Sequence, residues 1–426
     1  ATLRRDGTDK FFPGNKYALF PSVSGAWKIS NENFLKNISW INLLKLRASW
    51  GKTGQDNLGS SLYGSYAPNN FKVNFSDNGI INIPYVSMGA NYPDVSWQKT
   101  TMKNIGLDFY LLSDRISGSF DFFRNDITRL LGYASTSPLA IYETRPINGG
   151  HYYRRGWELM VDTKNLVGEF TWDTSLTFSK TNSFWKERLP NYDYQIYQQR
   201  ENEPMSAYYY YNVTGIINTD RSNMPESQKT LQAEAQLPGC PIIEDKNKDG
   251  KIDENDVYMK DNSPAIYVGI GNTFTYKRFE FSFFMYGQFG IQKYNIAYSA
   301  AQAGPLAVDY PENSNKFAYR LWNSQTNPNG SRPGLAIGKM GALPGNAWVN
   351  ADRENASFMR MRNITLAYNL AGNILGSLQR YVRNIKVYVD AQNPFILTKF
   401  QGFDPEIYTG GGGASGGSRG EYPQTR

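Results

Sequence analysis

Apolar and polar residues alternate one by one over spans of roughly ten residues, and this pattern recurs along the chain. In the segment 170–179 one face is formed by Phe170, Trp172, Leu176 and Phe178, whereas the opposite face carries only Thr, Asp and Ser. A tilted β-strand of about 9–11 residues has the length needed to cross a bilayer. The alternation therefore favours membrane-crossing strands whose apolar side chains face lipid and whose polar side chains face an enclosed interior.

The lengths of the strands and of their connections support this interpretation. The predicted strands are mostly about 9–13 residues long, whereas strands of soluble proteins are mostly about 5–6 residues. Tight connections at 112–115, 166–168 and 277–278 alternate with long ones at 126–152, 182–263 and 290–356. This alternation of short and long connections is typical of an up-and-down barrel with short periplasmic turns and long outer loops. The eleven predicted strands lie at 1–5, 17–29, 43–51, 99–112, 115–125, 153–164, 169–180, 264–276, 279–289, 357–369 and 384–392.

Both the first and the eleventh strand are predicted to run outward, so a twelfth, returning strand is expected near Tyr422. The segment Ala1–Arg5 has no apolar signal core and resembles the end of a strand. We therefore expect a fragment of a longer protein. The Gly-rich segment 410–417 is interpreted as a flexible loop.

The composition excludes several kinds of chemistry. The 426 residues include one His, His151, and one Cys, Cys240. A single Cys excludes an internal disulfide and a cysteine zinc cluster, and a single His excludes a multi-His metal centre. The chain has no run of 18 apolar residues, so no transmembrane helix is predicted. We expect no catalytic residues, and we interpret His151 and Cys240 as structural.

The charge distribution leaves two interpretations of the barrel interior. The net charge is +7, and Lys28, Lys45, Arg47 and Lys103 are predicted to face the lumen. A cationic lumen would attract acidic substrates. The alternative, which we favour, is that the lumen is neutralised by Asp108, Asp121, Asp162, Asp173 and Glu280. Nucleic-acid binding is not expected, because the basic residues are scattered.

The segment 245–256 matches an EF-hand-type calcium loop, with Gly250 at the sharp turn. The predicted Ca²⁺ ligands are Asp245, Asn247, Asp249, the carbonyl of Lys251, Asp253 and Asp256. Asp256 stands where Glu is usual, and its shorter side chain predicts weak binding, roughly 10⁻⁴–10⁻³ M as in extracellular modules. The alternative is an Asp- and Gly-rich turn that holds no ion.

Four consecutive tyrosines, Tyr208, Tyr209, Tyr210 and Tyr211, lie in the long connection 182–263. Aromatic rings suit the C–H faces of pyranose sugars, so these residues are candidates for substrate contact. The alternative, which we favour, is that they pack inside the loop or form an interfacial girdle.

Several segments, in the same order along the chain, resemble the SusC/RagA family of TonB-dependent outer-membrane transporters. They are Leu3-Arg4-Arg5-Asp6-Gly7 with residues 20–29, the segments 44–54, 104–109 and 358–368, and Asn393-Pro394-Phe395 with residues 402–406. One departure is Arg155-Gly156-Trp157-Glu158, where the family usually has Asn-x-Gly-x-Glu. Together the segments extend the resemblance over the whole chain.

The resemblance implies that residues 1–426 form the C-terminal half of a transmembrane barrel of about 22 strands, without the plug and the N-terminal domains. It further implies an outer-membrane importer of glycans or oligosaccharides, with peptides as another substrate class, in a Gram-negative bacterium. The expected partners are a SusD-like surface lipoprotein that acts as a lid, TonB, and outer-membrane lipid. A dimer of transporter–lid pairs is an open alternative.

Two other classes of protein compete with this hypothesis. A secreted, calcium-dependent β-sheet protein that binds or degrades glycans would have short strands and water solubility, and a hydrolase would need two carboxylates about 5–9.5 Å apart. A barrel that acts as an adhesin, without transport, is the third candidate.

Overall fold

The computed structural model describes most of the chain. The described residues are 1–58, 62, 66–68, 75–77, 80–82, 85–87, 91–136, 144–190, 194–295, 316–334, 337, 340–370, 380–382, 385–402 and 404–406. No helix in these ranges is long and apolar enough to cross a membrane. The predicted twelfth strand near Tyr422 and the Gly-rich segment 410–417 lie outside the described residues.

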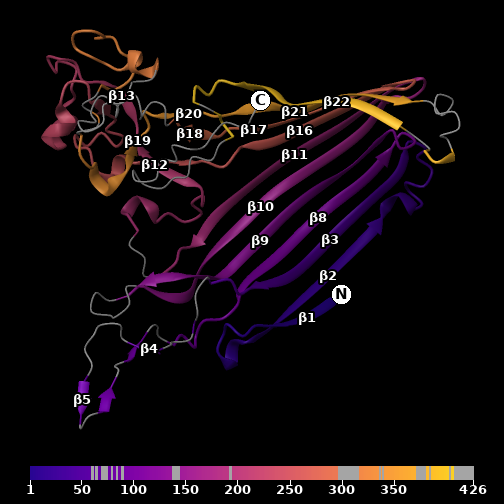
Figure 1. Cartoon of the computed structure of the whole chain (residues 1–426), viewed down its shortest axis with the longest axis horizontal. Coiled ribbons are helices and arrows are strands. Elements are labelled where there is room, and N and C mark those ends of the chain that lie inside the picture. The colour runs from indigo at the N-terminus through magenta and orange to yellow at the C-terminus, as the bar shows by residue number, and fades with distance from the viewer. Residues whose placement is uncertain are drawn as a thin grey trace.

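An antiparallel sheet of eleven strands dominates the fold (Figure 1). Its spatial order follows the order along the chain, so the sheet is built up and down without crossovers. The strands are β1 (Thr2–Gly7), β2 (Tyr17–Lys28), β3 (Ile41–Gln55), β8 (Gln98–Leu111), β9 (Ile116–Ser135), β10 (Thr144–Leu166), β11 (Phe170–Glu187), β16 (Ile266–Tyr276), β17 (Phe279–Phe289), β21 (Phe358–Leu370) and β22 (Ile385–Thr398). All eleven predicted strands are therefore confirmed.

The predicted long connection at 126–152 is wrong, because β9 and β10 continue well beyond the predicted strand ends. They stay paired up to Ser135 and Thr144. The pairing skips Arg129 and Gly150, one residue on each strand, without a change of register, and these residues have positive φ angles of 55° and 74°. Contacts with other loop segments, and not lipid, set the burial in this extension: Ala134 is fully buried and Leu131 packs against a loop core. The alternation that the bilayer imposes therefore ends before the strands do.

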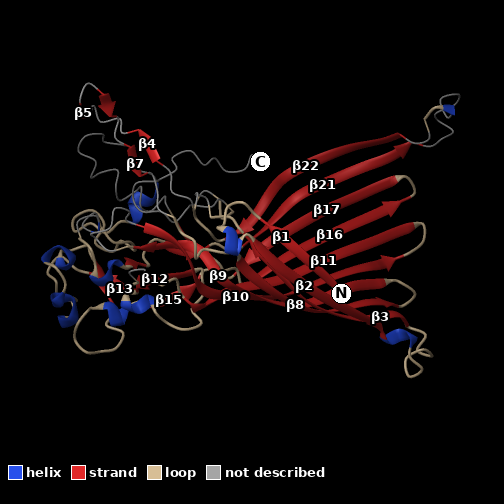
Figure 2. Cartoon of the chain, turned by 90° about the horizontal axis from the view of Figure 1, so that it is seen from below, coloured by secondary structure: helices blue, strands red, loops and turns tan. Residues whose placement is uncertain are grey.

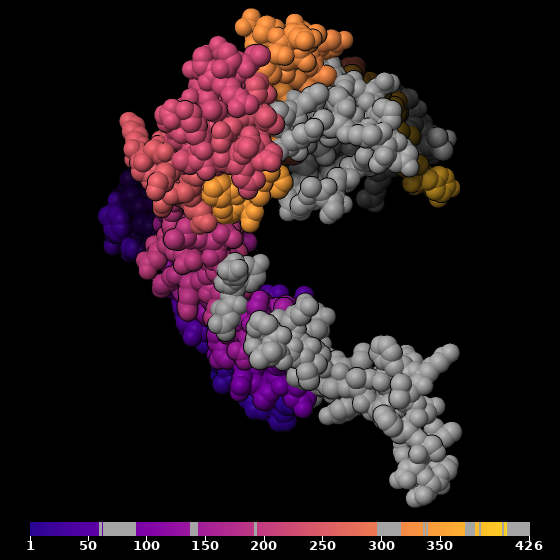
Figure 3. All heavy atoms as spheres, turned by 90° about the vertical axis from the view of Figure 1, so that its left-hand side faces the viewer, coloured from indigo at the N-terminus to yellow at the C-terminus, as the bar shows by residue number. Residues whose placement is uncertain are grey.

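The sheet is strongly curved, and the molecule bends around an open hollow (Figure 3). The tight turns gather at one end of the sheet and the long connections at the other, as Figure 2 shows. The turn at Leu112–Asp114 is left-handed, with φ angles of 55–61°. The tight turns between β8 and β9, β10 and β11, and β16 and β17 thus lie at one end as predicted, and the longer connection 29–40 between β2 and β3 lies at that end too.

One face of the sheet is apolar from strand to strand. A row of directly paired residues runs across five strands: Trp27, Leu46, Leu107, Phe120 and Leu159. Although apolar, Trp27 and Ile105 keep about half of their surface exposed, at 49% and 57%. In water such a face would be costly, whereas lipid tails cover it at no cost. This face is the outward one, and the opposite face lines the interior.

The long connections carry their own small elements. These are β4 (Tyr66–Pro68), β5 (Phe75–Asp77), β6 (Ile80–Asn82), β7 (Tyr85–Ser87), β12 (Ala207–Tyr211), β13 (Val213–Ile216), β14 (Pro241–Ile243), β15 (Tyr258–Asp261), β18 (Gln292–Tyr294), β19 (Trp348–Val349), β20 (Arg353–Asn355), and the 3-10 helices Pro13–Asn15, Ile29–Asn31, Ile196–Gln198, Glu226–Thr230, Ala233–Gln236, Glu254–Asp256, Lys316–Arg320 and Pro344–Asn346. Most of them form the loop structure at the outer end of the sheet, whereas the short helix Ile29–Asn31 lies at the end of the tight turns, where the N–H of Leu112 bonds the carbonyl of Trp40.

Candidate functional site

Two long connections fold together into one compact unit, which we call the loop cap (residues 194–263 and 340–352). Its core is formed by buried side chains from both connections: Tyr197, Tyr211, Ile217, Leu231, Ala235, Cys240, Ile242, Ile243, Ile252, Val257, Met340, Leu343 and Ala347. Each connection alone would leave its apolar residues in water, so the hydrophobic effect favours their joint folding. The predicted burial of Cys240 is confirmed, and burial raises the pKa of its thiol to about 11.

Hydrogen bonds join the two halves of the loop cap. The hydroxyl of Tyr197 donates to the carbonyl of Gly345 at 2.6 Å. The hydroxyl of Tyr211 lies 3.0 Å from the carbonyl of Pro344, and at the same distance from the carbonyl of Asp253 in its own connection. Strand β19 pairs in parallel with β12, which adds backbone bonds between residues far apart in the chain. The loop cap is therefore braced as one body at the outer end.

The four candidate tyrosines divide into two pairs, because they alternate along β12. Tyr211 is fully buried in the core, and Tyr209 packs against that core from the same side. The hydroxyl of Tyr209 accepts a hydrogen bond of 3.2 Å from Arg188, whose other partner is the buried carboxylate of Glu203. Burial raises the pKa of both tyrosines, so neither ionises at neutral pH. For Tyr209 and Tyr211 the structure supports packing.

Tyr208 and Tyr210 lie on the opposite face of β12. Their rings stack at 5.1 Å, and Tyr258 of β15 continues the stack at 5.7 Å. The guanidinium of Arg353 lies 3.6 Å from the ring centre of Tyr208. Trp348 of β19 is the register partner of Tyr210 of β12, and it is 70% exposed. This tyrosine–tryptophan face of the loop cap is half-buried, and it keeps one exposed indole ring.

The first three predicted ligands of the calcium loop agree in part with the EF-hand arrangement. Asp245 accepts the backbone N–H of Gly250 at 2.8 Å, and Asn247 accepts that of Asp249 at 3.1 Å. Asp249 accepts the N–H of Lys251 at 2.9 Å. The second carboxylate oxygen of Asp245, Oδ1, is buried and has no hydrogen-bond partner within the described residues. These turns keep three side chains in the order that an EF-hand uses.

The carboxylate of Asp256, at the twelfth position of the EF-hand-type loop, is not placed to coordinate an ion. Its carboxylate is buried, and it accepts backbone N–H groups from Lys246 at 2.8 Å and from Asp253 at 2.8 Å. Asp253 in turn caps the short helix Glu254–Asp256. Among the described residues, no group of three or more His, Cys, Asp or Glu side chains is placed to hold a metal ion. Calcium binding therefore stays a prediction.

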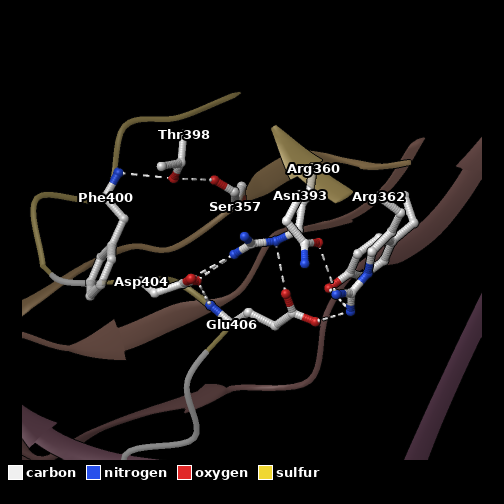
Figure 4. Close-up of polar contacts among 9 residues, drawn as sticks. Ser357, Arg360, Arg362, Asn393, Thr398, Phe400, Asp404 and Glu406 are labelled. Atoms are coloured by element: carbon white, nitrogen blue, oxygen red, sulfur yellow. Dashed lines mark hydrogen bonds and ion pairs between the residues drawn. The ribbon is translucent and has the colours of Figure 1, made fainter. Parts of the chain in front are cut away.

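An ion-pair cluster fixes the segment after β22 to the interior face of β21 (Figure 4). Arg360 is only 2% exposed, and its guanidinium lies 2.6 and 2.7 Å from the two carboxylate oxygens of Asp404. Glu406 bridges Arg360 and Arg362 at 2.9 and 2.7 Å. A buried pair of this kind is held by its geometry, because each charge would be costly alone. We call these residues the charge anchor.

A β-bulge explains why Arg362 points inward beside Arg360. Arg362 has no partner on β17, where Phe284 and Met285 pair with Asn363 and Met361, so it is an extra residue of β21 on that side. On the other side it lies opposite Asn393 and Pro394 of β22. Its guanidinium donates to the hydroxyl of Tyr286 at 3.0 Å and to the side chain of Asn393 at 3.2 Å. Three segments that resemble the SusC/RagA family, around 358–368, 393–395 and 402–406, therefore meet in one cluster.

Ion pairs neutralise much of the predicted interior charge. Arg47 lies 2.8 Å from Asp108 and 3.0 Å from Asp121, and Lys45 lies 3.3 Å from Asp108. Lys386 pairs with Glu280 at 2.9 Å. These contacts support the neutralised lumen over the cationic one.

The prediction that Lys103 faces the lumen is wrong. Lys103 pairs directly with Trp50 and with Arg124 across the sheet, and directly paired residues share a face. It stands two residues from Ile105, so both side chains point outward.

A second set of charges in the loops was not predicted from the sequence. Arg332 lies 3.3 Å from Glu354 and 3.7 Å from Asp352. Asp352 is 8% exposed, and burial raises the pKa of its carboxyl to about 6, against the opposing effect of Arg332. No fixed spacing relates these residues, and only their contacts in the fold connect them.

The chain is similar to TonB-dependent receptors. It is 29% identical over 421 residues to the TonB-dependent receptor SusC of Bacteroides thetaiotaomicron, covering 96% of this chain and 40% of the relative. It is 27% identical over 419 residues to the TonB-dependent receptor P3 of Formosa agariphila, covering 95% of this chain and 40% of that protein. The chain thus spans about two fifths of the length of these relatives. No family model matches it.

The fold is similar to that of a solved importer. The RagAB peptide importer in its closed-closed state matches with a TM-score of 0.73 and 20% sequence identity, over 95% of this chain and 42% of the importer chain. A second structure, described as the RagAB peptide transporter, matches with a TM-score of 0.72 at 20% identity, over 95% of this chain and 42% of that chain. With the relatives above, these likenesses confirm the predicted barrel fold and the location in the outer membrane of a Gram-negative bacterium.

Proposed function

This chain resembles SusC/RagA-type TonB-dependent outer-membrane transporters along almost its whole length, and from that premise we propose that it forms wall and outer loops of a nutrient importer. The substrate is a glycan or oligosaccharide, or a peptide. It is held between the outer loops and a SusD-like surface lipoprotein, and TonB delivers the energy for its release inward. No bond-making residue is required, and the relatives are described as receptors and transporters.

The single observation that carries this proposal is the braced loop cap at the outer end of membrane-crossing strands. A capture surface must keep its shape while substrate binds, because ordering a loose loop would reduce affinity. The shared core and the hydrogen bonds of Tyr197 and Tyr211 supply that rigidity. The neutralised interior suits a substrate without strong charge, because few unpaired charges line the interior to bind the substrate during its passage.

The tyrosine–tryptophan face of the loop cap is our candidate for substrate contact. Of the four tyrosines, only Tyr208 and Tyr210 lie on this face, and Trp348 beside them has an exposed ring. A sugar ring places C–H groups against such an indole. The likeness to the RagAB peptide importer supports peptides as the second substrate class.

An uptake experiment tests the proposal. Cells that lack the gene are supplied with labelled oligosaccharides or labelled oligopeptides, and the same cells carrying the gene serve as the reference. We expect uptake of one class to require both the protein and TonB. Uptake of both classes that is unchanged without the protein would contradict the proposal and would favour the adhesin alternative. The soluble sugar-binding alternative is not supported, because the strands are long and their apolar face is exposed.

Co-purification tests the proposed partner. We expect a surface lipoprotein to accompany the full-length protein in detergent, with a mass that also shows whether two transporter–lid pairs associate. A full-length protein that is always recovered alone, although it supports uptake, would remove the lid from the proposal and leave the import role intact.

A further inference from the structure

Three basic side chains lie next to one another on the outward face of the sheet. Lys103 of β8 pairs directly with Arg124 of β9, and Arg124 pairs directly with Arg155 of β10. Their side chains share a face with Trp50, which pairs with Lys103. Lys52 and Lys180 flank this row, each two positions along its own strand from the row. We call Lys103, Arg124 and Arg155 the basic row.

The basic row lies at the outer boundary of the apolar face. The next outward-facing residues toward the tight turns are Ile105, Phe122 and Trp157, so apolar side chains begin directly below the row. Eight residues separate Lys103 from Leu111 at the end of β8. They span about 27 Å of strand, or about 20 Å along the membrane normal at the usual tilt. The row therefore lies where lipid tails give way to headgroups on the outer side.

The row has more positive charge than its protein surroundings balance. Like charges in directly opposed positions of a sheet repel each other. Asp126 pairs with Arg124 at 3.0 Å. Among the described residues, neither Lys103 nor Arg155 forms an ion pair, and the same holds for the flanking Lys180. An anion supplied from outside the chain would relieve the repulsion.

Aromatic rings hold the two arginines in place. The guanidinium of Arg124 lies 4.3 Å from the ring centre of Tyr153, and that of Arg155 lies 5.2 Å from Phe184. The rings of Tyr153 and Phe184 are themselves stacked at 5.3 Å. Stacking through its face leaves the N–H edge of Arg155 available, and this edge matches a phosphate group, whereas two nitrogens of Arg124 already donate to Asp126.

We propose that the basic row binds phosphate groups of the glycolipid in the outer leaflet of the outer membrane. The lipid tails lie against the apolar side chains below, and the phosphates meet Lys103 and Arg155, with Arg124 shared between the lipid and Asp126. This site faces lipid and is separate from the proposed substrate surface. Lipid binding by the basic row requires only that the protein lies in the outer membrane. Its test is therefore independent of the proposed import role.

Native mass spectrometry of the full-length protein in detergent tests the site, with lipid A as the phosphorylated probe. We expect the double variant Lys103→Ala/Arg155→Ala to bind lipid A about 30-fold more weakly, as expected for two basic residues near an anionic lipid. Arg154→Ala is the matched control, because Arg154 neighbours Arg155 but points to the other face and bonds Ser183 at 3.3 Å. We expect Arg154→Ala to bind as the wild type does.

Three results would overturn the proposal. The first is wild-type affinity in the double variant, and the second is an equal loss in Arg154→Ala. The third is equal affinity for lipid A without its phosphates or for phosphatidylglycerol, which would show that the row does not select this glycolipid. Heat-shifted migration in SDS gels verifies that the barrel has formed. Should the alanine variant fail that check, Lys103→Gln/Arg155→Gln replaces it, and Lys103→Arg/Arg155→Lys is expected to restore binding.

Discussion

Arg360 and Asp404 are 44 residues apart in the chain, and one guanidinium nitrogen of Arg360 lies 2.6 and 2.7 Å from the two oxygens of the Asp404 carboxylate. This contact fastens the segment after β22 to the inside of β21. Removing the arginine leaves the buried carboxylate of Asp404 without its counter-charge, whereas Glu406 keeps its contact with Arg362 at 2.7 Å.

We expect Arg360→Ala to cost about 3–5 kcal/mol of local stability in the charge anchor, the usual loss when one partner of a buried pair is removed. Hydrogen exchange of the backbone around Gln401 measures this loss. Lys229→Ala is the matched control, because its pair with Glu226 is exposed and is expected to contribute less than about 1 kcal/mol. Unchanged exchange around Gln401 in Arg360→Ala would contradict the role of the anchor.

Tyr211→Phe tests the bracing of the loop cap. The variant keeps the buried ring and removes only the hydroxyl, which contacts the carbonyls of Asp253 and Pro344. We expect a loss of about 1–3 kcal/mol, because two carbonyl groups in the loop cap lose that partner. Proteolysis of the 340–352 segment should accelerate, whereas migration of the barrel in SDS gels should not change. Equal proteolysis rates would show that the two halves are held by the core alone.

Trp348→Ala tests the tyrosine–tryptophan face as a substrate surface. The ring is 70% exposed, so its loss should leave folding intact. We expect about fivefold weaker substrate binding, which corresponds to about 1 kcal/mol from one stacking contact. Tyr319→Ala is the control, because Tyr319 is 87% exposed and lies outside this face. If both variants bind substrate as the wild type does, the face serves packing only.

Asp352 predicts a stability change with pH. Its pKa is about 6 in the folded protein, above the ordinary value of 3.8. The folded state therefore binds more protons between these values, and the contribution of this residue to stability falls as pH rises through about 4 to 6. The upper limit is about 3 kcal/mol, from a difference of about 2.2 in pKa. Hydrogen exchange near Arg353 at pH 5 and pH 7 measures the effect, and Asp352→Asn should remove it. An equal pH dependence in Asp352→Asn would assign it to other groups.

We expect calcium to bind the 245–256 loop weakly, roughly at 10⁻⁴–10⁻³ M, through Asp245, Asn247 and Asp249. Oδ1 of Asp245 is buried and has no hydrogen-bond partner in the part of the chain that the structure describes, which supports this expectation. Calorimetric titration of the full-length protein measures it, and Asp245→Ala should abolish the heat of binding. Asp220→Ala serves as the control, because that carboxylate lies outside the loop. An absence of heat in the wild type would identify the segment as a turn held by its own hydrogen bonds.

The membrane-crossing part of the fold was predictable because the bilayer imposes a two-residue period on each strand. All eleven strands follow from it, down to the tight turn at Lys277. The period also determines which side a residue faces: Lys103 has the same parity as Ile105 and therefore faces outward, although it is charged. Above the membrane the bilayer no longer acts, so the extensions of β9 and β10 left no pattern.

The candidate site was less predictable, because its contacts join residues far apart in the chain. The four tyrosines were predicted to lie in a long connection and no strand was predicted there, and only the pairing of β12 with β15 and β19 separates Tyr209 and Tyr211 from Tyr208 and Tyr210. The charge anchor joins segments whose motifs were recognised one by one. Nothing in their spacing indicated that Arg362 is the extra residue of a bulge against β17.

The shared core of the loop cap limits how this protein can be altered. Leu343 comes from one connection and Ile217 from the other, and both are buried in the same cluster. Grafting a single connection from a relative would set foreign side chains against an unaltered half and create gaps or clashes. Changing the substrate specificity by exchanging loops therefore requires that both connections be transplanted together as one unit.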